Sequence, residues 1–257
     1  MKHVKTRVLL AAAALALAGV AYAEDLTDPA TTNVSFQGPG GVTLHGYLAT
    51  PQSSGRLPAV LMIHEWWGLN RDITHLADAL AAQGFVVLAA DGFRGGLAKD
   101  APGATKLVTQ TPGQQISGDL DAALAYLESL PSVDPARVAS LGFCFGGTQS
   151  MYMGTRDPGL AAVVILYGPG PIQDAARLGK MKEAGPVLGI FGQEDPNIPT
   201  DQVKAFAAAL NAAGVPNTVT IYPGVGHAFV KTATYQDGKA AQQAWQQVVD
   251  FLRAKLG

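Results

Sequence analysis

Two segments near the start of the chain alternate apolar with polar residues. They cover residues 33–37 and 42–48, and the tetrapeptide Gly-Pro-Gly-Gly at 38–41 separates them. A period of two is typical of a strand with one buried face, and a glycine- and proline-rich turn between two such runs indicates an antiparallel pair. The pattern therefore predicts a β-hairpin ahead of the rest of the fold.

Beyond the hairpin, short apolar runs take turns with segments of helical spacing. An unbroken apolar run of four to eight residues is typical of a strand buried in a parallel sheet, whereas apolar residues at i, i+3, i+4 and i+7 indicate an amphipathic helix. The predicted strands are 59–63, 85–89, 138–143, 161–167, 187–191 and 218–222. The predicted helices carry apolar faces at Ile73, Leu76, Ala77 and Leu80, at Leu120, Ala123, Leu124 and Leu127, at Val203, Phe206, Ala207 and Leu210, and at Ala241, Ala244, Trp245, Val248 and Leu252.

This alternation predicts an α/β protein with one domain. Strands and helices that follow one another in turn form an open, mostly parallel sheet with helices on both faces, here with about eight strands and the N-terminal antiparallel hairpin. The chain contains no repeat, low-complexity segment or linker that would divide it. The glycine- and proline-rich segment 92–113 is expected to be a long loop with at most a short helix, and loops of that length are often functional.

The first 23 residues have the pattern of a signal peptide. Lys2, Lys5 and Arg7 precede an apolar run of 13 residues from Val8 to Val20, and small residues follow at the positions that a signal peptidase reads. We expect cleavage after Ala23, export to the periplasm or the medium, and a mature domain of residues 24–257. An uncleaved anchor is the alternative, although the run is shorter than the ~20 residues that span a bilayer.

Composition narrows the class of partner to small molecules. The chain has 18 basic and 20 acidic residues, and no basic run or basic-aromatic pattern favours nucleic acid. Its single cysteine cannot form an internal disulfide, so the thiol is available for chemistry. His64-Glu65 lacks the second histidine of a zinc motif, and neither a Walker loop nor a dinucleotide fingerprint occurs. We therefore expect no metal and no cofactor. We also expect a monomer.

The sequence Ser-Leu-Gly-Phe-Cys-Phe-Gly-Gly-Thr at 140–148 is typical of a nucleophile elbow. In that motif the nucleophile occupies a strained turn between a strand and a helix, and the flanking glycines leave room for close backbone approach. Here Cys144 stands between Gly142 and Gly146. A thiol at a helix N-terminus is favoured as thiolate by the helix dipole. The alternative is a small buried hydrophobic cysteine.

Three further chemical groups follow predicted strands. Glu65, Asp195 and His227 lie just after the strands that end at 63, 191 and 222, where ligands bind in open α/β sheets. The order nucleophile, acid and histidine is that of a hydrolase triad. His227 would take the proton of Cys144 and Asp195 would orient the imidazole, with the neighbouring Glu194 as the alternative acid.

The segment at Glu65 is also the place for an oxyanion donor. The backbone N–H of Trp66 could pair with that of Phe145 to hold a tetrahedral oxyanion. A carboxylate at Glu65 would raise the pKa of the thiol or accept its proton. Alternatively, Glu65 only caps a turn.

At these residues the chain resembles the dienelactone hydrolase family of α/β-hydrolases. The resemblance extends from about Val42 to the C-terminus and rests on His-Glu-Trp-Trp-Gly-Leu-Asn at 64–70, Gly-Phe-Cys-Phe-Gly-Gly at 142–147, Gly-Gln-Glu-Asp-Pro-Asn-Ile-Pro at 192–199 and Gly-His-Ala-Phe at 226–229. It implies a Cys144-His227-Asp195 triad with Glu65 tied to the resting thiol until substrate displaces it. It also implies a carboxylic-ester or lactone hydrolase.

The resemblance is weaker where the family's lactone-cleaving members bind the substrate carboxylate. Those members use two arginines and a serine. Arg94 is near the first arginine position, but Ala228 and Lys231 stand at the other two. A lysine holds an anion less rigidly than an arginine, so we expect a broad preference for small anionic esters or lactones. A thioesterase or peptidase, a non-catalytic anion-binding protein and a redox-responsive thiol protein remain alternatives, as does an ordinary surface position for Lys231.

Overall fold

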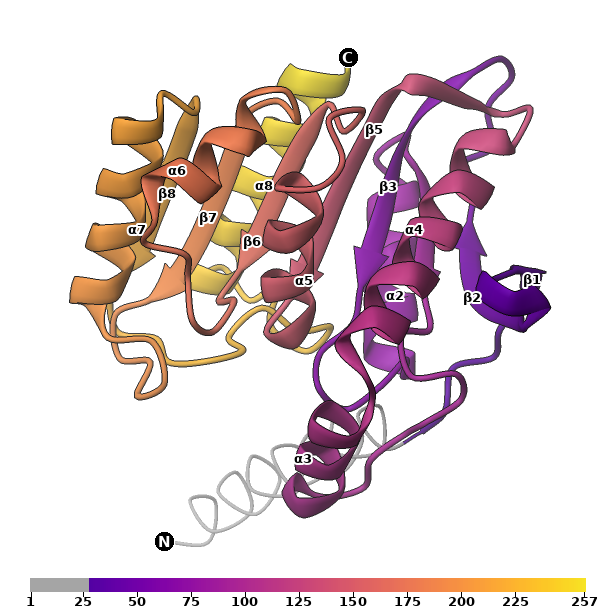
Figure 1. Cartoon of the computed structure of the whole chain (residues 1–257), viewed down its shortest axis with the longest axis horizontal. Helices are drawn as coiled ribbons and strands as arrows, with labels where there is room; N and C mark the ends of the chain where they lie inside the picture. The colour runs from indigo at the N-terminus through magenta and orange to yellow at the C-terminus, as the bar shows by residue number, and fades with distance from the viewer. Residues whose placement is uncertain (1–27) are drawn as a thin grey trace, which may run out of the picture.

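The computed structural model describes residues 28–257, and the predicted signal peptide with its cleavage site lies outside them. A single eight-stranded sheet runs through the molecule (Figure 1). In these residues no helix has the length and apolarity needed to cross a membrane. The strands are β1 (Val34–Gln37), β2 (Thr43–Ala49), β3 (Leu57–Ile63), β4 (Val86–Ala90), β5 (Val133–Phe143), β6 (Ala162–Leu166), β7 (Val187–Gly192) and β8 (Asn217–Tyr222).

The sheet order is β1-β2-β4-β3-β5-β6-β7-β8. The predicted hairpin is confirmed: β1 and β2 pair antiparallel across the 3₁₀ turn η1 (Pro39–Gly41), and β2 pairs antiparallel with β4. Every pairing from β4 to β8 is parallel. The carboxyl ends of β3 to β8 therefore share one edge of the sheet, which is where the sequence places its chemical groups.

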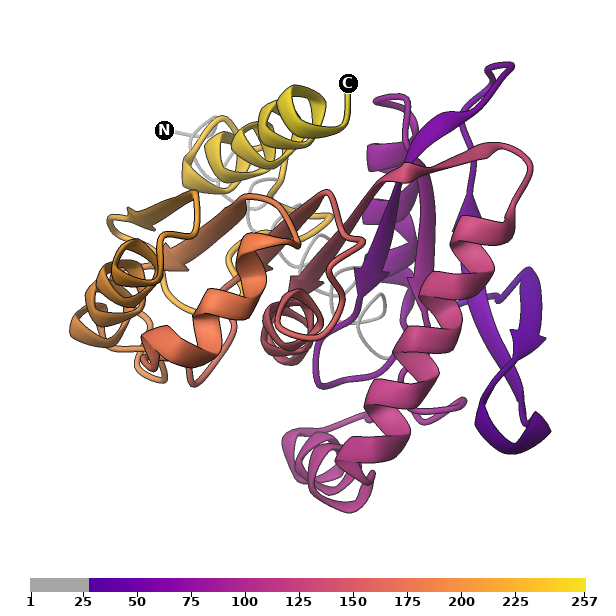
Figure 2. The same ribbon diagram turned by 45° about the horizontal axis from the view of Figure 1, so that its top comes forward.

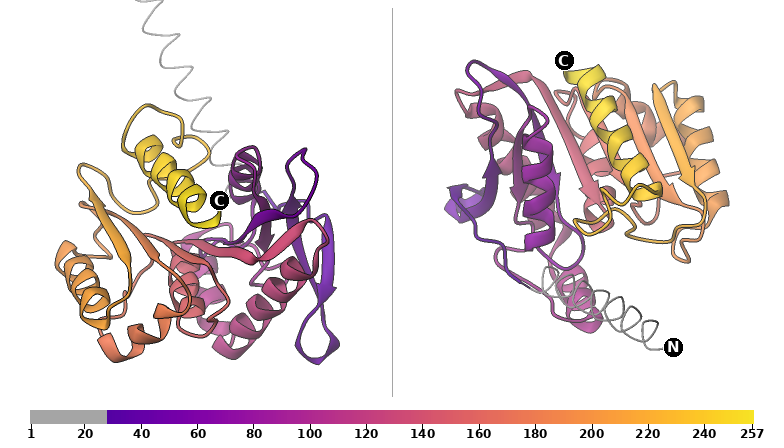
Figure 3. Two further views of the ribbon diagram at one scale, coloured as in Figure 1. Left: turned by 90° about the horizontal axis from the view of Figure 1, so that it is seen from above. Right: turned by 180° about the vertical axis from the view of Figure 1, so that it is seen from behind.

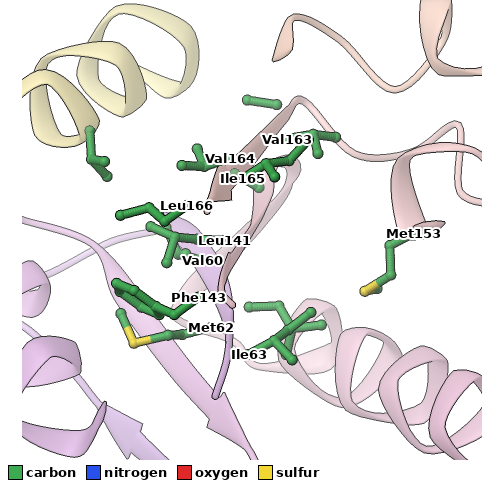
Figure 4. Packing of buried hydrophobic residues seen from close by; sticks show 14 of the residues in the cluster. Val60, Met62, Ile63, Leu141, Phe143, Met153, Val163, Val164, Ile165 and Leu166 are labelled. Atoms are coloured by element: carbon green, nitrogen blue, oxygen red, sulfur yellow. The ribbon is translucent and has the colours of Figure 1, made fainter. Parts of the chain in front are cut away.

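Helices cover both faces of the sheet, as predicted. Figures 1 and 2 show α4 to α7 on one face, and the rear view in Figure 3 shows α2 and α8 on the other. The inner strands β3, β4, β6 and β7 are buried because they are apolar on both sides, whereas the edge strand β8 is partly exposed. Figure 4 shows buried side chains of β3, β5 and β6 packed together. The helices are α2 (Arg71–Ala81), α3 (Ala101–Gln110), α4 (Gly113–Ser129), α5 (Phe145–Gly154), α6 (Ala175–Leu178), η2 (Gly179–Lys182), α7 (Thr200–Ala213) and α8 (Ala240–Leu256).

The segment 92–113, for which the sequence predicts a long loop with at most a short helix, contains a helix of 10 residues at 101–110. These residues form α3, which lies beyond the carboxyl ends of the strands (Figure 1). The Asp100 side chain caps the helix by accepting a hydrogen bond from Gly103 N–H at 2.8 Å. Pro102 lies in the first turn, where a missing N–H does no harm. Its apolar positions Ala104, Leu107 and Val108 fill little more than one turn, and Pro102 and Gly103 precede them, so the segment has the composition of a loop.

Candidate active site

The predicted strand-turn-helix geometry around Cys144 is confirmed. Cys144 separates β5 from α5 and has φ 52° and ψ −116°, a strained conformation for a residue with a side chain. A Cβ added to Gly142 would lie 1.9 Å from the carbonyl oxygen of Gly146, and one added to Gly146 would lie 2.2 Å from the oxygen of Ile63. Both glycines are therefore required by close backbone packing, and Cys144 is held at the carboxyl edge of the sheet.

The electrostatic surroundings of Cys144 favour the neutral thiol. Burial, and after it the negative charge of Glu65, raise the pKa of Cys144 to about 12. Hydrogen bonding from Phe145 N–H, the positive charge of Lys231 and hydrogen bonding from Trp66 N–H oppose that rise without cancelling it. The expected thiolate at the helix N-terminus is thus outweighed by desolvation, since the residue is only 8% exposed.

The two backbone N–H groups proposed as oxyanion donors converge on the sulfur. Phe145 N–H comes from the first residue of α5, and Trp66 N–H comes from the loop after β3. Both act on Cys144 as hydrogen-bond donors that favour its charged form. An oxyanion formed on a carbonyl carbon bonded to the sulfur would lie close to these donors, so the arrangement suits acyl transfer.

Asp195 and His227 form a hydrogen-bonded pair. Asp195 Oδ2 lies 2.6 Å from His227 Nδ1, and Asp195 Oδ1 accepts a hydrogen bond from Asn197 N–H at 2.8 Å. Asp195 is buried whereas Glu194 is exposed, so the structure brings Asp195 and not its neighbour to the histidine. The Asp195 contact leaves Nε2 of His227 for a reacting group. Within residues 28–257 no hydrogen bond joins His227 to Cys144.

Tyr167 supports the histidine and was missed from the sequence. Its ring packs edge-on against the ring of His227, with a centroid distance of 5.3 Å. Its hydroxyl donates a hydrogen bond to the carbonyl oxygen of Val230 at 3.0 Å, which holds the His227 loop. Tyr167 has φ 39° and directly follows β6. The predicted strand 161–167 includes Tyr167, whereas β6 ends at Leu166, so the signal that identifies Asp195 and Glu65 was hidden by one residue.

Glu65 and Lys231 form an ion pair next to the thiol. Lys231 Nζ donates to Glu65 Oε2, and both side chains are at least 95% buried. Glu65 Oε1 is buried without a hydrogen-bond partner in residues 28–257. The loop that carries Lys231 is fixed to α2 because Thr232 N–H donates to Asp72 Oδ1 at 2.9 Å. Lys231 is therefore not a surface lysine, its charge is paired with Glu65 in this structure, and Glu65 does more than cap a turn.

Arg94 is also held by a carboxylate of the protein. Its Nε and Nη2 donate to the two oxygens of Asp119 at 2.7 and 2.8 Å. Such a bidentate pair uses the face of the guanidinium that would otherwise hold a carboxylate. Arg94 does not line the pocket beside Cys144. The structure thus places both predicted anion-binding residues in ion pairs of the protein itself.

A pocket of about 430 Å³ opens beside Cys144. None of the described residues that line it is charged. Across residues 28–257, no group of three His, Cys, Asp or Glu residues is placed to hold a metal ion. The pocket lies between the elbow and the junction of α3 with α4, and its lining consists of Trp66, Val108, Thr111, Gly113, Ile116, Cys144, Phe145, Thr148, Gln149 and Pro169.

The charge of Glu65 has a measurable consequence for the thiol. Because a raised pKa keeps Cys144 protonated, the wild type should react slowly with iodoacetamide near neutral pH. Glu65→Gln removes a group that raises this pKa and leaves Lys231 to stabilise the thiolate, so alkylation should accelerate at least ~10-fold, the effect of one pKa unit. The measurement is the alkylation rate against pH by intact mass.

Glu183→Gln is the matched control, because Glu183 is exposed and precedes the amino end of β7, away from the carboxyl edge of the sheet. It should alkylate at the wild-type rate. Slower alkylation of Glu65→Gln would mean that the carboxylate accepts the thiol proton instead of suppressing ionisation.

Comparison with known proteins gives one consistent result. The model of the dienelactone hydrolase family matches residues 44–256. A Synechocystis protein named "putative carboxymethylenebutenolidase" is 34% identical over 82% of this chain and 92% of its own length. A "putative dienelactone hydrolase" from Klebsiella pneumoniae superposes with a TM-score of 0.75, 26% identity, and coverage of 87% of this chain and 99% of its own. A dienelactone hydrolase-like promiscuous phosphotriesterase from metagenomic libraries superposes with a TM-score of 0.76 and 25% identity, and the match covers 88% of this chain and 99% of its own.

Proposed function

Because this chain belongs to the dienelactone hydrolase family, a family of hydrolases, we propose that it cleaves small esters or lactones through an acyl-enzyme on Cys144. One observation carries the proposal. Cys144 lines an uncharged pocket and is influenced by two backbone N–H donors, at the same sheet edge as the His227–Asp195 pair.

The proposed reaction has two halves. First, Nε2 of His227 takes the thiol proton, the sulfur bonds to the carbonyl carbon, and the N–H groups of Phe145 and Trp66 hold the oxyanion. The carbon–oxygen bond to the leaving alcohol breaks as His227 returns the proton to it. Water then attacks the thioester, His227 takes a proton from that water, and the acid leaves as the proton returns to sulfur.

The Glu65–Lys231 pair fits the resting state of this cycle. Glu65 helps to keep the thiol neutral, so Cys144 does not exist as a permanently reactive thiolate. When a substrate enters the pocket and contacts the sulfur, the thiol proton would pass from Cys144 to His227. The same burial argues against the redox alternative, since oxidation of a cysteine proceeds through an accessible thiolate.

The pocket favours a neutral substrate over the anionic one that the sequence suggests. A carboxylate entering the apolar lining would lose water without meeting a cation, because Arg94 and Lys231 are already paired. For an ester substrate that also carries a carboxylate, we expect methylation of that carboxylate to raise kcat/KM by at least ~10-fold. Steady-state kinetics on the two substrates measure this ratio.

Arg94→Ala should leave the ratio within about twofold of the wild type. Arg156→Ala is the control, because Arg156 forms an ion pair with Asp121 and does not line the pocket. A wild-type preference for the carboxylate-bearing ester that disappears in Arg94→Ala would show that this arginine binds the substrate carboxylate.

A substrate screen tests the proposed function itself. Purified protein comprising residues 24–257 is assayed with short aryl esters, unsaturated lactones and matching thioesters, and Cys144→Ala serves as the blank. Hydrolysis of the oxygen esters above the blank supports the proposal, whereas turnover of thioesters alone would favour the thioesterase alternative. Export, and a monomeric state, stay predictions from the sequence.

A further inference from the structure

His64 is a fully buried histidine that the proposed triad does not use. Its Nε2 accepts a hydrogen bond from Gly92 N–H at 3.0 Å, and its Nδ1 lies 2.5 Å from the carbonyl oxygen of Glu65. A backbone N–H can only donate, so Nε2 is the unprotonated nitrogen and Nδ1 carries the hydrogen. Burial lowers the pKa of His64 and favours this neutral form. The ring therefore donates from Nδ1–H to the Glu65 carbonyl.

That carbonyl belongs to the same peptide unit as an oxyanion donor. The C=O of Glu65 and the N–H of Trp66 lie in one planar trans peptide and point in opposite directions. Any group that fixes the carbonyl also fixes the direction of the N–H. The carbonyl accepts a second, longer hydrogen bond from Gly68 N–H at 3.3 Å. The Nδ1–H of His64 is the shorter of the two and comes from a rigid ring.

The ring of His64 also contacts the other half of the site. Its ring stacks on that of Phe145 with a centroid distance of 6.1 Å, and its centroid lies 5.0 Å from that of the Phe93 ring. The His64 carbonyl oxygen is among the atoms that exclude a Cβ from Gly146, at 2.6 Å. His64 therefore packs between the loop that provides Trp66 N–H and the turn that provides Phe145 N–H.

We propose that His64 is a positioning residue that aims the Trp66 N–H into the oxyanion hole. The proposal rests on the proposed function, because it concerns the same acyl-transfer step. His64 takes no proton from the substrate and touches no reacting atom. It acts by holding the Glu65–Trp66 peptide plane, so it affects steps in which an oxyanion forms and leaves other reactions of Cys144 nearly unchanged.

The test compares ester hydrolysis with alkylation of the same thiol. Iodoacetamide reacts at carbon without forming an oxyanion, and Trp66 N–H is the weakest of the influences that set the thiol pKa. His64→Leu removes the donor and should lower kcat for a short aryl ester at least ~30-fold, below the full loss of an oxyanion donor. Its alkylation rate should stay within about threefold of the wild type. His64→Gln presents one donor and one acceptor at a spacing close to that of the ring nitrogens, and should restore hydrolysis to within about tenfold.

The exposed His45 on β2 gives the control His45→Leu, which should match the wild type. Near-normal hydrolysis by folded His64→Leu overturns the proposal, as does an equal loss of hydrolysis and alkylation. If His64→Leu does not fold, folded His64→Gln decides: retained hydrolysis supports the proposal and a ~10²-fold loss overturns it. Failure of the proposed function is separate, because it appears as activity that survives Cys144→Ala.

Discussion

Replacing Cys144 by alanine is expected to lower kcat/KM for a short aryl ester at least ~10⁴-fold, the scale on which loss of a nucleophile acts. Without the sulfur no acyl-enzyme forms, and only the N–H donors and the pocket remain to assist water. The substitution removes one atom from a buried site whose backbone is fixed by Gly142 and Gly146, so the fold should persist. Steady-state kinetics and circular dichroism measure the two effects.

Trapping the acyl-enzyme in the wild type complements this loss of activity. The wild-type protein is incubated with a slowly hydrolysed ester and its intact mass is measured. The protein should gain the mass of one acyl group, and tandem mass spectrometry should place it on Cys144. Thr155→Ala at the C-cap of α5 is a control on the same helix but outside the pocket, and it should acylate normally. Activity that survives in folded Cys144→Ala would remove the proposed mechanism.

Replacing His227 by alanine is expected to lower kcat at least ~10³-fold, because both the thiol and the leaving group depend on its proton transfers. The neutral thiol of Cys144 makes this dependence stronger, since a cysteine already ionised at rest would need no base for acylation. Kinetics across pH, with thermal unfolding as the fold control, provide the measurement. Asp195→Asn should show a smaller loss, because the imidazole remains but its orientation is no longer fixed by a charged acceptor.

His45→Ala serves as the histidine control, since His45 is exposed on β2. It should keep the wild-type kcat. A His227→Ala protein that folds and turns over at a near-normal rate would show that another group moves the protons.

The sequence predicted most of the fold because the core is apolar on both faces of its parallel strands. Unbroken runs such as 59–63 and 187–191 can be stable only inside such a sheet. The hairpin followed from alternation, and the doubly covered sheet followed from the order of elements. The extent of α3 was not predicted because its apolar positions fill little more than one turn and follow Pro102 and Gly103, which are typical of a loop.

The sequence also determined which residues gather at the edge of the sheet where the strands end. Cys144, Asp195, His227 and Glu65 each follow a strand, and parallel strands bring such positions to one edge. The glycines of the elbow could be identified because the close packing at that turn excludes any side chain. These are consequences of chain order and of local sterics, so they can be read without coordinates.

Only the tertiary structure decided the state and partners of the charged groups. Lys231 and Glu65 are 166 positions apart in the chain, yet they form a buried ion pair, and Arg94 is bound by Asp119 instead of facing the pocket. The thiol pKa is set by burial that no local pattern records. Electrostatic energies depend on distance and desolvation in space, which a sequence does not specify, so the change from an expected anionic to a proposed neutral substrate came from the folded chain alone.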